Sequence, residues 1–196
     1  ILTLRLPRIL MAVLSGFALA VAGTVMQSIT RNYLVSPFTV GIASASAFGA
    51  SLCIILGISS ITHVIGSAFT VSILCLLLLY GIASRIGMSP SSLILVGISL
   101  NYLFSALIEL IKFFARGYQL ENIIQWSFGS LARAEWDNII ILWFVVVICT
   151  LVIIRFSMEL DILSNNTDEV SKSLGINYAK IRVITGALAV LMTATV

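Results

Sequence analysis

The sequence predicts an all-α fold, a polytopic membrane helix bundle, from its composition, its charge distribution and its first apolar run. Hydrophobic residues make up 60% of the 196 residues and charged residues only 10%, with a mean hydropathy of +1.13. No Asp, Glu, Lys or Arg occurs between Arg31 and Arg85. A soluble chain of this length could not cover its surface with so few charges. The uncharged run of residues 9–30 would extend about 33 Å as a helix, enough to cross a bilayer core.

Six apolar segments follow one another along the chain, and each is long enough to cross a bilayer, some of them with tilt. Pro37 opens the second segment, at a position that suits the first turn of a helix. We expect helices over residues 7–28, 37–58, 62–84, 90–115 and 136–156, and over a last stretch that starts near Tyr178 and is still apolar at Val196.

Small residues recur at a spacing of about four in the first two segments, which places them on one face of each helix. The stripes are Ala12, Gly16, Ala20 and Gly23 in the first segment, and Gly41, Ala45, Gly49 and Cys53 in the second. Such stripes let helices approach closely inside lipid, so they indicate a packed bundle and not a single anchor. The three cysteines lie in apolar runs without ligand spacing, and we interpret them as small packing residues.

The connection of residues 116–135 is one of two that are longer than the others. Ile124, Phe128 and Leu131 recur in it at helical spacing. This pattern predicts a short interfacial helix over residues 121–131, with an apolar face turned toward the membrane.

The connection of residues 157–177 is the most polar part of the chain, and it predicts a short helix over residues 167–175. The signals are a cap at Asn166 or Thr167, negative charge in the first turn at Asp168 and Glu169, a small apolar face of Val170 and Leu174, and a left-handed stop at Gly175. A helix this short is not stable alone in water, so it must lie against the rest of the protein or against a partner. The alternative is a solvated connector.

The charge distribution between loops gives a weak indication of orientation. Of the 11 Lys and Arg residues, six fall on the side of residues 157–177 and five on the other side. Arg31, which flanks the first apolar run, and Arg182 are among the six. Because basic residues are enriched in cytoplasmic loops, the margin of one charge favours a cytoplasmic position for residues 157–177.

The fourth apolar segment carries a polar face. Gly97, Asn101, Ser105 and Glu109 recur on it at a spacing of four, with Lys112 close to the same face. Polar groups in membrane helices usually face a bundle interior or a water-filled path. We therefore interpret Gly97, Asn101 and Ser105 as lining a pathway, with hydrogen bonding between helices as the alternative. Glu109 and Lys112 are interpreted as an ion pair near the end of the helix.

The sequence offers no pattern for covalent chemistry. His63 stands alone, without partners at metal or triad spacing, and no base is placed to activate the serines of residues 44–51. The glycine-rich loop GxxxxGK[ST] is absent, so this chain does not bind ATP by that device. We expect a protein that is not an enzyme, with no catalytic residue, no metal, no cofactor and no nucleic-acid partner.

Four blocks of the sequence are specific enough to compare with known families. They are RLPRILMAVLSGFALAVAGTVMQSITRNYLVSPFTVGIASASAFGA, LILVGISLNYLFSAL, WSFGSLARAEWDNI and TDEVSKSLGINYAKIRVI. In this order they resemble the FecCD-type permeases, the type II ABC importers of iron-siderophores, haem and cobalamin. The resemblance covers essentially the whole chain, and apolar composition alone would not produce its first and last blocks.

The resemblance implies a fold of roughly ten helices per subunit, in a bacterial or archaeal cytoplasmic membrane. Residues 1–196 would form a single but incomplete transmembrane permease domain, without the first helix and the C-terminal helices, and residues 157–177 its cytoplasmic coupling loop. The implied partners are ABC ATPase subunits, an extracytoplasmic substrate-binding protein and a second permease copy or paralogue. We expect the isolated piece to be unstable, because missing helices would leave the faces of residues 16–23 and 41–49 partly uncovered.

The resemblance also implies roles for individual residues. They are Arg5 and Arg8 for docking of the binding protein, Asn32, Leu34 and Ser91 for a cytoplasmic gate, and Thr167, Asp168, Glu169, Val170, Leu174 and Gly175 for coupling to the ATPase. Tyr33 stands where the family usually has proline, which is a departure within the gate loop.

The function implied is ATP-driven alternating access that imports an iron chelate. Ferric siderophore is the family's commonest cargo, with haem and cobalamin as rivals, and ATP hydrolysis belongs to the partner subunit. The alternative is a gradient-driven secondary transporter that uses Glu109. Such carriers bury a coupling carboxylate near the midplane, whereas Glu109 lies toward a helix end.

Overall fold

The computed structural model describes residues 5–58, 60–131 and 134–196, and in this part of the chain it contains α-helices and no strand. The helices are α1 (Arg5–Thr30), α2 (Ile42–Ile55), α3 (Ile61–Arg85), α4 (Pro90–Phe114), α5 (Tyr118–Phe128), α6 (Trp136–Arg155), α7 (Ser157–Asn165), α8 (Asp168–Ser173) and α9 (Tyr178–Ala194). The all-helical prediction is therefore confirmed.

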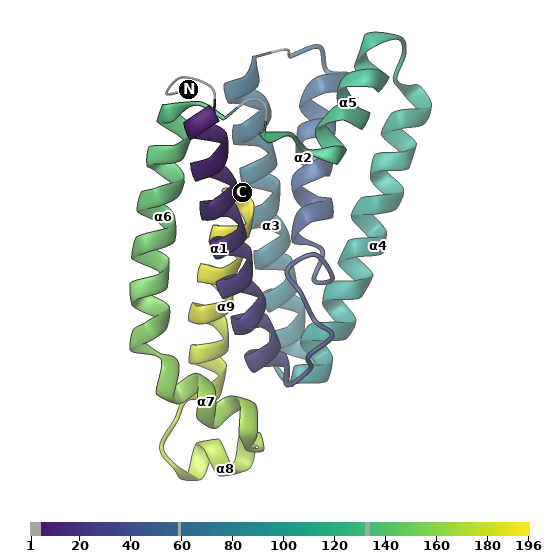
Figure 1. Ribbon diagram of the computed structural model, residues 1–196. Coiled ribbons are helices and arrows are strands. Elements are labelled where there is room, and N and C mark those ends of the chain that lie inside the picture. Colours follow the sequence, from purple (N-terminus) through teal and green to yellow (C-terminus); the bar gives the residue numbers. More distant parts are fainter. Residues whose placement is uncertain (1–4, 59, 132–133) are drawn as a thin grey trace.

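The long helices run side by side, and the short ones lie at the two ends of the bundle (Figure 1). Helices α1, α6 and α9 form one part and α2, α3 and α4 the other, with α9 contacting both α2 and α3. The short helices α7 and α8 lie at one end, which we call the α8 end. The start of α1 and the helix α5 lie at the opposite end, the α5 end. Four helices, α1, α3, α4 and α6, are long and apolar enough to cross a membrane.

Helix α2 is shorter than the sequence predicts. The prediction of a helix from Pro37 is wrong, because residues 31–41 form consecutive turns and α2 begins only at Ile42. Ser36 and Thr39 bond each other through backbone and hydroxyl groups, which holds a turn at the position of Pro37. Gly41 then has a φ of +87°, a left-handed conformation that a helix cannot contain.

The two small-residue stripes have different surroundings. The second is buried as predicted, and at Gly49 an added Cβ would lie 2.6 Å from the carbonyl oxygen of Ser67 on α3. The first lies on the open side of α1: no atom of the described chain is within 4 Å of a Cβ built at Gly16 or Gly23. Helix α1 instead packs inward through Ala18 and Ala22, which are fully buried. Of the two predicted uncovered faces, only that of residues 16–23 is uncovered.

The two connecting regions contain more helix than predicted, or helix at shifted positions. The interfacial helix α5 spans Tyr118–Phe128, three residues earlier than predicted, because Gly129 adopts a φ of +69° and ends it. Residues 157–165 form α7, which the sequence interpretation missed. The predicted short helix is present as α8, and its ends are described with the site.

Candidate functional site

Helix α8 is built by local signals at both of its ends. The hydroxyl of Thr167 accepts a hydrogen bond from the N–H of Val170 at 3.5 Å, which makes Thr167 the N-cap. At the other end Gly175 has a φ of +78°, and the N–H groups of Gly175 and Ile176 bond the carbonyls of Lys172 and Ser171. These two bonds form a Schellman motif, so the predicted cap and stop are both confirmed.

The side chains of α8 divide into an outer and an inner face. Val170 and Leu174 are 44% and 60% exposed, and Glu169 is exposed beside them. Ser171 is fully buried, and Asp168 is directed toward the bundle. The apolar pair predicted from the sequence is therefore a free surface in this chain, at the α8 end of the molecule.

Asp168 holds two arginines from distant parts of the chain, a cluster we call the Asp168 hub. Arg182 of α9 donates from Nη1 to Oδ2 at 2.9 Å and from Nη2 to Oδ1 at 2.7 Å. Arg31, which follows α1, donates from Nη2 to Oδ1 at 2.6 Å and from Nε to the carbonyl of Leu163 on α7 at 2.6 Å. The hub consists of these three residues, and it joins α1, α7, α8 and α9.

Arg182 is fully buried, so its charge must be compensated inside the protein. Besides the two bonds to Asp168, it donates to the carbonyl of Ile29 at 3.2 Å and to that of Met88 at 2.8 Å. Its guanidinium carbon also lies 5.3 Å from the centre of the Tyr178 ring. These contacts satisfy most of the guanidinium donors, and they draw the α3–α4 connection into the same cluster.

The backbone is strained at two positions that border the hub. Within the described residues, Arg31 and Met88 are the two non-glycine residues with positive φ, at +50° and +53°. Such a conformation costs on the order of 1–3 kcal/mol and persists where the surroundings over-determine it. At Arg31 it accompanies two side-chain hydrogen bonds of the hub, and at Met88 a carbonyl that faces Arg182.

The ionisation of Asp168 follows from its neighbours. Burial alone raises the pKa of its carboxyl, but the hydrogen bonds and charges of Arg182, and then of Arg31, lower the pKa by more. The net pKa therefore lies below the usual value for aspartate. The carboxylate is charged at neutral pH, as both arginines require.

Tyr80 of α3 is buried and contacts the backbone of Arg182, a member of the hub. Its hydroxyl donates to the carbonyl of Arg182 at 2.9 Å, and the ring fits against α9 because residue 186 is glycine. A Cβ at Gly186 would overlap Tyr80 Oη and lie 3.0 Å from Tyr80 Cζ. The missing side chain thus determines where α3 and α9 meet.

We predict that Gly186→Ala displaces Tyr80 and lowers the free energy of unfolding by about 1–3 kcal/mol, through overpacking and loss of the hydrogen bond to Arg182. Thermal unfolding of the full-length protein in detergent measures this. Gly81→Ala is the matched control, because no described atom is within 4 Å of its Cβ. Tyr80→Phe removes the overlapping oxygen, so in combination with Gly186→Ala it should recover part of the loss. Equal losses for the single and double variants would contradict this account.

Two of the predicted gate residues, Asn32 and Leu34, lie in the turns that follow Arg31, and Ser91 lies in the first turn of α4. The side chain of Asn32 accepts a hydrogen bond from the N–H of Leu34 at 2.9 Å, and Leu34 is 87% exposed. Ser91 is exposed at the start of α4, and its hydroxyl bonds that of Ser89 at 3.0 Å. Leu34 and Ser91 are therefore presented at the surface near the α8 end, and the half-buried Asn32 stabilises the turn that carries Leu34.

The polar face of α4 is only partly open. Asn101 and Ser105 are half-buried, whereas Gly97 is buried and would place a Cβ 3.0 Å from Val40. Its small size therefore serves a close contact with the turn segment before α2. Lys112 bonds Glu109 at 2.8 Å, and the Glu109 side chain is 71% exposed, as expected for a pair at a helix end.

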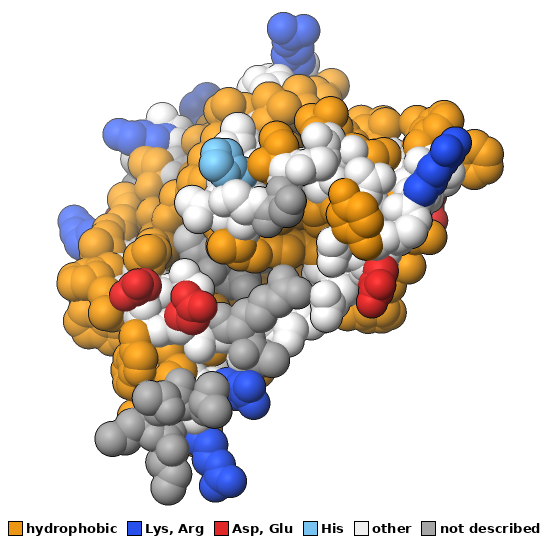
Figure 2. Space-filling view, turned by 90° about the horizontal axis from the view of Figure 1, so that it is seen from above, with side chains coloured by type: hydrophobic (Ala, Val, Ile, Leu, Met, Phe, Trp, Pro, Cys, Tyr) orange, Lys and Arg blue, Asp and Glu red, His pale blue; other side chains and the backbone are white. Residues whose placement is uncertain are grey.

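Arg5 and Arg8 lie at the opposite end of the bundle from α8, and both are exposed. They lie at the start of the described part of α1, and the described turn that holds them contains no acidic side chain. Figure 2 looks onto this end and shows Lys and Arg side chains spread around a largely hydrophobic surface.

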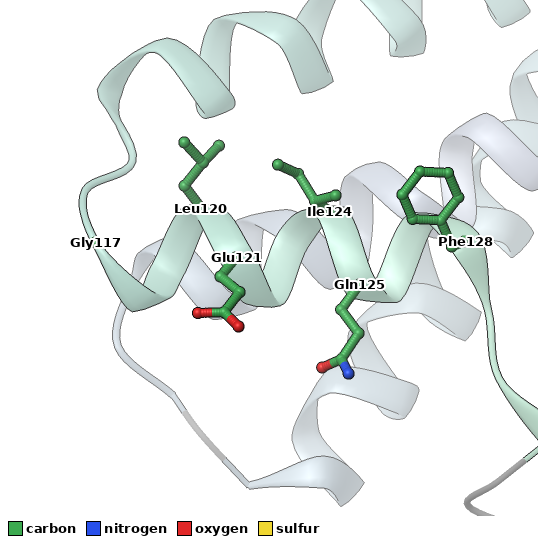
Figure 3. Close-up of a pocket in the computed structure, with 6 residues that line it drawn as sticks. All are labelled: Gly117, Leu120, Glu121, Ile124, Gln125 and Phe128. Carbon is green, nitrogen blue, oxygen red and sulfur yellow. The ribbon is translucent and has the colours of Figure 1, made fainter.

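A shallow hollow lies along α5 at this end (Figure 3). Leu120, Ile124 and Phe128 point to one side of the helix, and Glu121 and Gln125 point to the other. The predicted apolar face is thus present but uses Leu120, since Leu131 follows the end of the helix. Among the residues that the structure describes, no group of three His, Cys, Asp or Glu side chains could hold a metal ion.

Sequence reasoning missed the partners of Asp168. It treated Arg31 as a flanking charge and only counted Arg182 toward the charge of one side, although an arginine inside a helix that continues into an apolar run requires a buried partner. That rule applied to Arg182 could have indicated a buried pair. Nothing local indicated Arg31, which lies 137 residues from Asp168 in the chain.

The comparisons with known proteins agree with this architecture. Residues 1–196 match the model of the FecCD transport family. A Methanocaldococcus jannaschii protein named as an ABC transporter permease is 37% identical, covering 97% of this chain and 58% of that protein. The Haemophilus influenzae molybdate import system permease MolB is 36% identical, covering 93% and 54%. The chain thus spans little more than half the length of these relatives.

A solved structure extends the likeness to the fold. It is described as an inward-facing conformation of an ABC transporter assigned to the metal-chelate type. The match has a TM-score of 0.90 at 32% identity, and it covers 98% of this chain and 62% of that one. Other relatives are named for haemin transport, Fe(3+)-citrate import and cobalamin import.

Proposed function

This chain belongs to the FecCD transport family, and we propose that it forms part of a membrane permease subunit of a binding-protein-dependent ABC importer. The observation that carries the proposal is the placement of its two candidate docking surfaces. The exposed apolar pair of α8 lies at one end of the bundle, and the exposed Arg5 and Arg8 lie at the other. An importer needs one surface for an ATPase and one for a binding protein.

In this proposal the α8 end is cytoplasmic. A loaded binding protein docks when its acidic groups contact Arg5 and Arg8. On the other side, the ATPase subunits contact Val170 and Leu174, and they close when they bind ATP. The closure moves α8, and the helices alternate between outward and inward access to the pathway. The protein itself performs no covalent chemistry, and a second permease subunit completes the pathway.

We propose an iron chelate as the cargo, with ferric siderophore as the first choice. Relatives are named for iron chelatin, haemin, Fe(3+)-citrate and cobalamin, and one for molybdate. Asn101 and Ser105 on α4, the half-buried polar groups, would line the pathway. The gradient-driven alternative has little support, since Glu109 is exposed and paired with Lys112.

The test is uptake in proteoliposomes that contain the full-length permease, its ATPase and its binding protein. Ferric siderophore, haem, cobalamin and molybdate are offered in parallel. We expect ATP-dependent uptake of one iron chelate. Uptake that needs no ATP but follows an ion gradient would overturn the proposal in favour of a secondary transporter.

The docking role of the arginine pair predicts a specific loss. Changing both Arg5 and Arg8 to Glu should lower uptake roughly tenfold, because repulsion of acidic groups replaces attraction at the binding-protein surface. Arg116→Glu, an exposed arginine at the same end, is the control and should change uptake little. The affinity of the binding protein for the permease, measured separately, should fall in parallel. Unchanged affinity in the double variant would exclude this role.

A further inference from the structure

The Asp168 hub does more than the docking of α8 requires. An ATPase surface needs only the outer face of α8, yet the inner face is tied by a half-buried carboxylate that pairs with two arginines. We propose that the hub is a rigid joint that makes α8 and both predicted gate turns move as one body. This inference rests on the proposed function and names the residues that transmit the movement.

The chain connects each gate turn directly to the hub. Arg31 is followed at once by Asn32, the first residue of one predicted gate turn. Met88, whose carbonyl accepts from Arg182, is followed by Ser89, the N-cap of α4, whose hydroxyl bonds that of Ser91 in the first turn of this helix. A displacement of Asp168 therefore reaches one turn through its bond to Arg31, and the other through Arg182 and the carbonyl of Met88.

The geometry of the hub resists rotation as well as separation. Arg182 donates one hydrogen bond to each carboxylate oxygen of Asp168. This pair of bonds fixes the angle between the guanidinium plane and the carboxylate plane. Arg31 bonds Asp168 and the carbonyl of Leu163 at the same time, so α7 cannot turn away from α8. A single point charge in place of either arginine would hold the distance but not the angle.

Just before both predicted gate positions, the backbone adopts an unfavourable conformation that supports the contacts of the hub. Arg31 and Met88 are the two non-glycine residues of the described chain with positive φ. One directs a guanidinium at Asp168, and the other directs a carbonyl at Arg182. Strain of this kind is kept where function requires a conformation that local preferences do not favour.

Asp168→Asn is the test variant, because asparagine keeps the size and removes the charge. The readout is the number of cargo molecules transported per ATP hydrolysed by the full complex in proteoliposomes. A joint that transmits movement should fail by uncoupling: ATP hydrolysis continues while this ratio falls by at least about tenfold. A merely structural residue would lower transport and hydrolysis together, with an unchanged ratio, and that result would overturn the proposal.

Two further variants calibrate the result. Asp161→Asn makes the same change at an exposed carboxylate of α7 and should leave the ratio unchanged. Arg31→Lys keeps the charge and loses the planar fork, so it should lower the ratio about threefold. If Asp168→Asn does not assemble with the ATPase, Arg31→Lys decides, and a ratio equal to that of the wild type overturns the proposal.

Hydrogen exchange keeps the inference separate from the transport function. In the full-length permease without nucleotide, the amides of α8 should exchange at least about tenfold faster in Asp168→Asn than in Asp161→Asn. Equal exchange would overturn the rigid joint. Absence of ATP-driven uptake in the wild type would instead overturn the proposed function, and the exchange result would still decide whether the joint exists.

Discussion

Gly49→Ala is expected to separate α2 from α3 and to destabilise the protein more than Gly186→Ala does. The new Cβ would lie 2.6 Å from the carbonyl oxygen of Ser67 and 3.0 Å from the Cα of Ala68. Both neighbours are backbone atoms, so no side chain can move aside. The two helices must shift apart, and the hydrogen bond from the Ser67 hydroxyl to the Gly49 carbonyl, now 2.7 Å, is lost.

The expected cost is about 3 kcal/mol, at the upper end of what overpacking usually costs, and it lowers the Tm of the full-length permease. Thermal unfolding of the full-length permease in detergent measures it. Gly66→Ala on α3 is the matched control, because its Cβ has no described neighbour within 4 Å. Because alanine has a higher helix propensity than glycine, Gly66→Ala should be neutral or slightly stabilising. If Gly49→Ala unfolds at the same temperature as the wild type, α2 and α3 are not in close contact at this position.

The second large effect is expected on the outer face of α8. Changing Val170 and Leu174 to Glu should lower ATP-driven uptake at least about tenfold, because apolar anchors dominate the energy of such contacts. The fold should survive, since both side chains are exposed in this chain. The measurement pairs uptake with co-purification of the ATPase, and both should fall together.

Met158→Glu is the control for that experiment. Met158 lies on α7 at the same end and is 77% exposed, but no docking role is assigned to it. We expect near-normal uptake and ATPase binding. Retention of ATPase binding by the α8 double variant would mean that the ATPase contacts another surface of the permease.

The sequence could predict features that depend on short-range chemistry. Thr167 and Gly175 mark the ends of α8 because a cap and a left-handed stop act within a few residues. The Glu109–Lys112 pair follows from helical spacing for the same reason. Four of the six apolar segments are confirmed as helices long enough to cross a membrane.

The features that the sequence could not predict depend on distant partners. The start of α2 is set by Gly41, whose left-handed conformation places it against the backbone of Asn101 on α4. The stripe of α1 has the pattern of a packing face, but the described chain supplies no helix to cover it. Arg31 reaches Asp168 across most of the chain, so no local pattern contains that pair.

The shortness of α2 leaves non-helical backbone beside the long helices of the bundle. Its 14 residues extend about 21 Å, less than the roughly 30 Å of a bilayer's hydrocarbon core. The turns of residues 31–41 cover the remainder, and non-helical backbone at that depth persists only where protein or water satisfies it. Gln27 and Asn32 each supply one side-chain bond to this backbone. In the proposed permease, these turns are therefore shielded from lipid by the surrounding helices or by water, and α2 alone does not span the bilayer core.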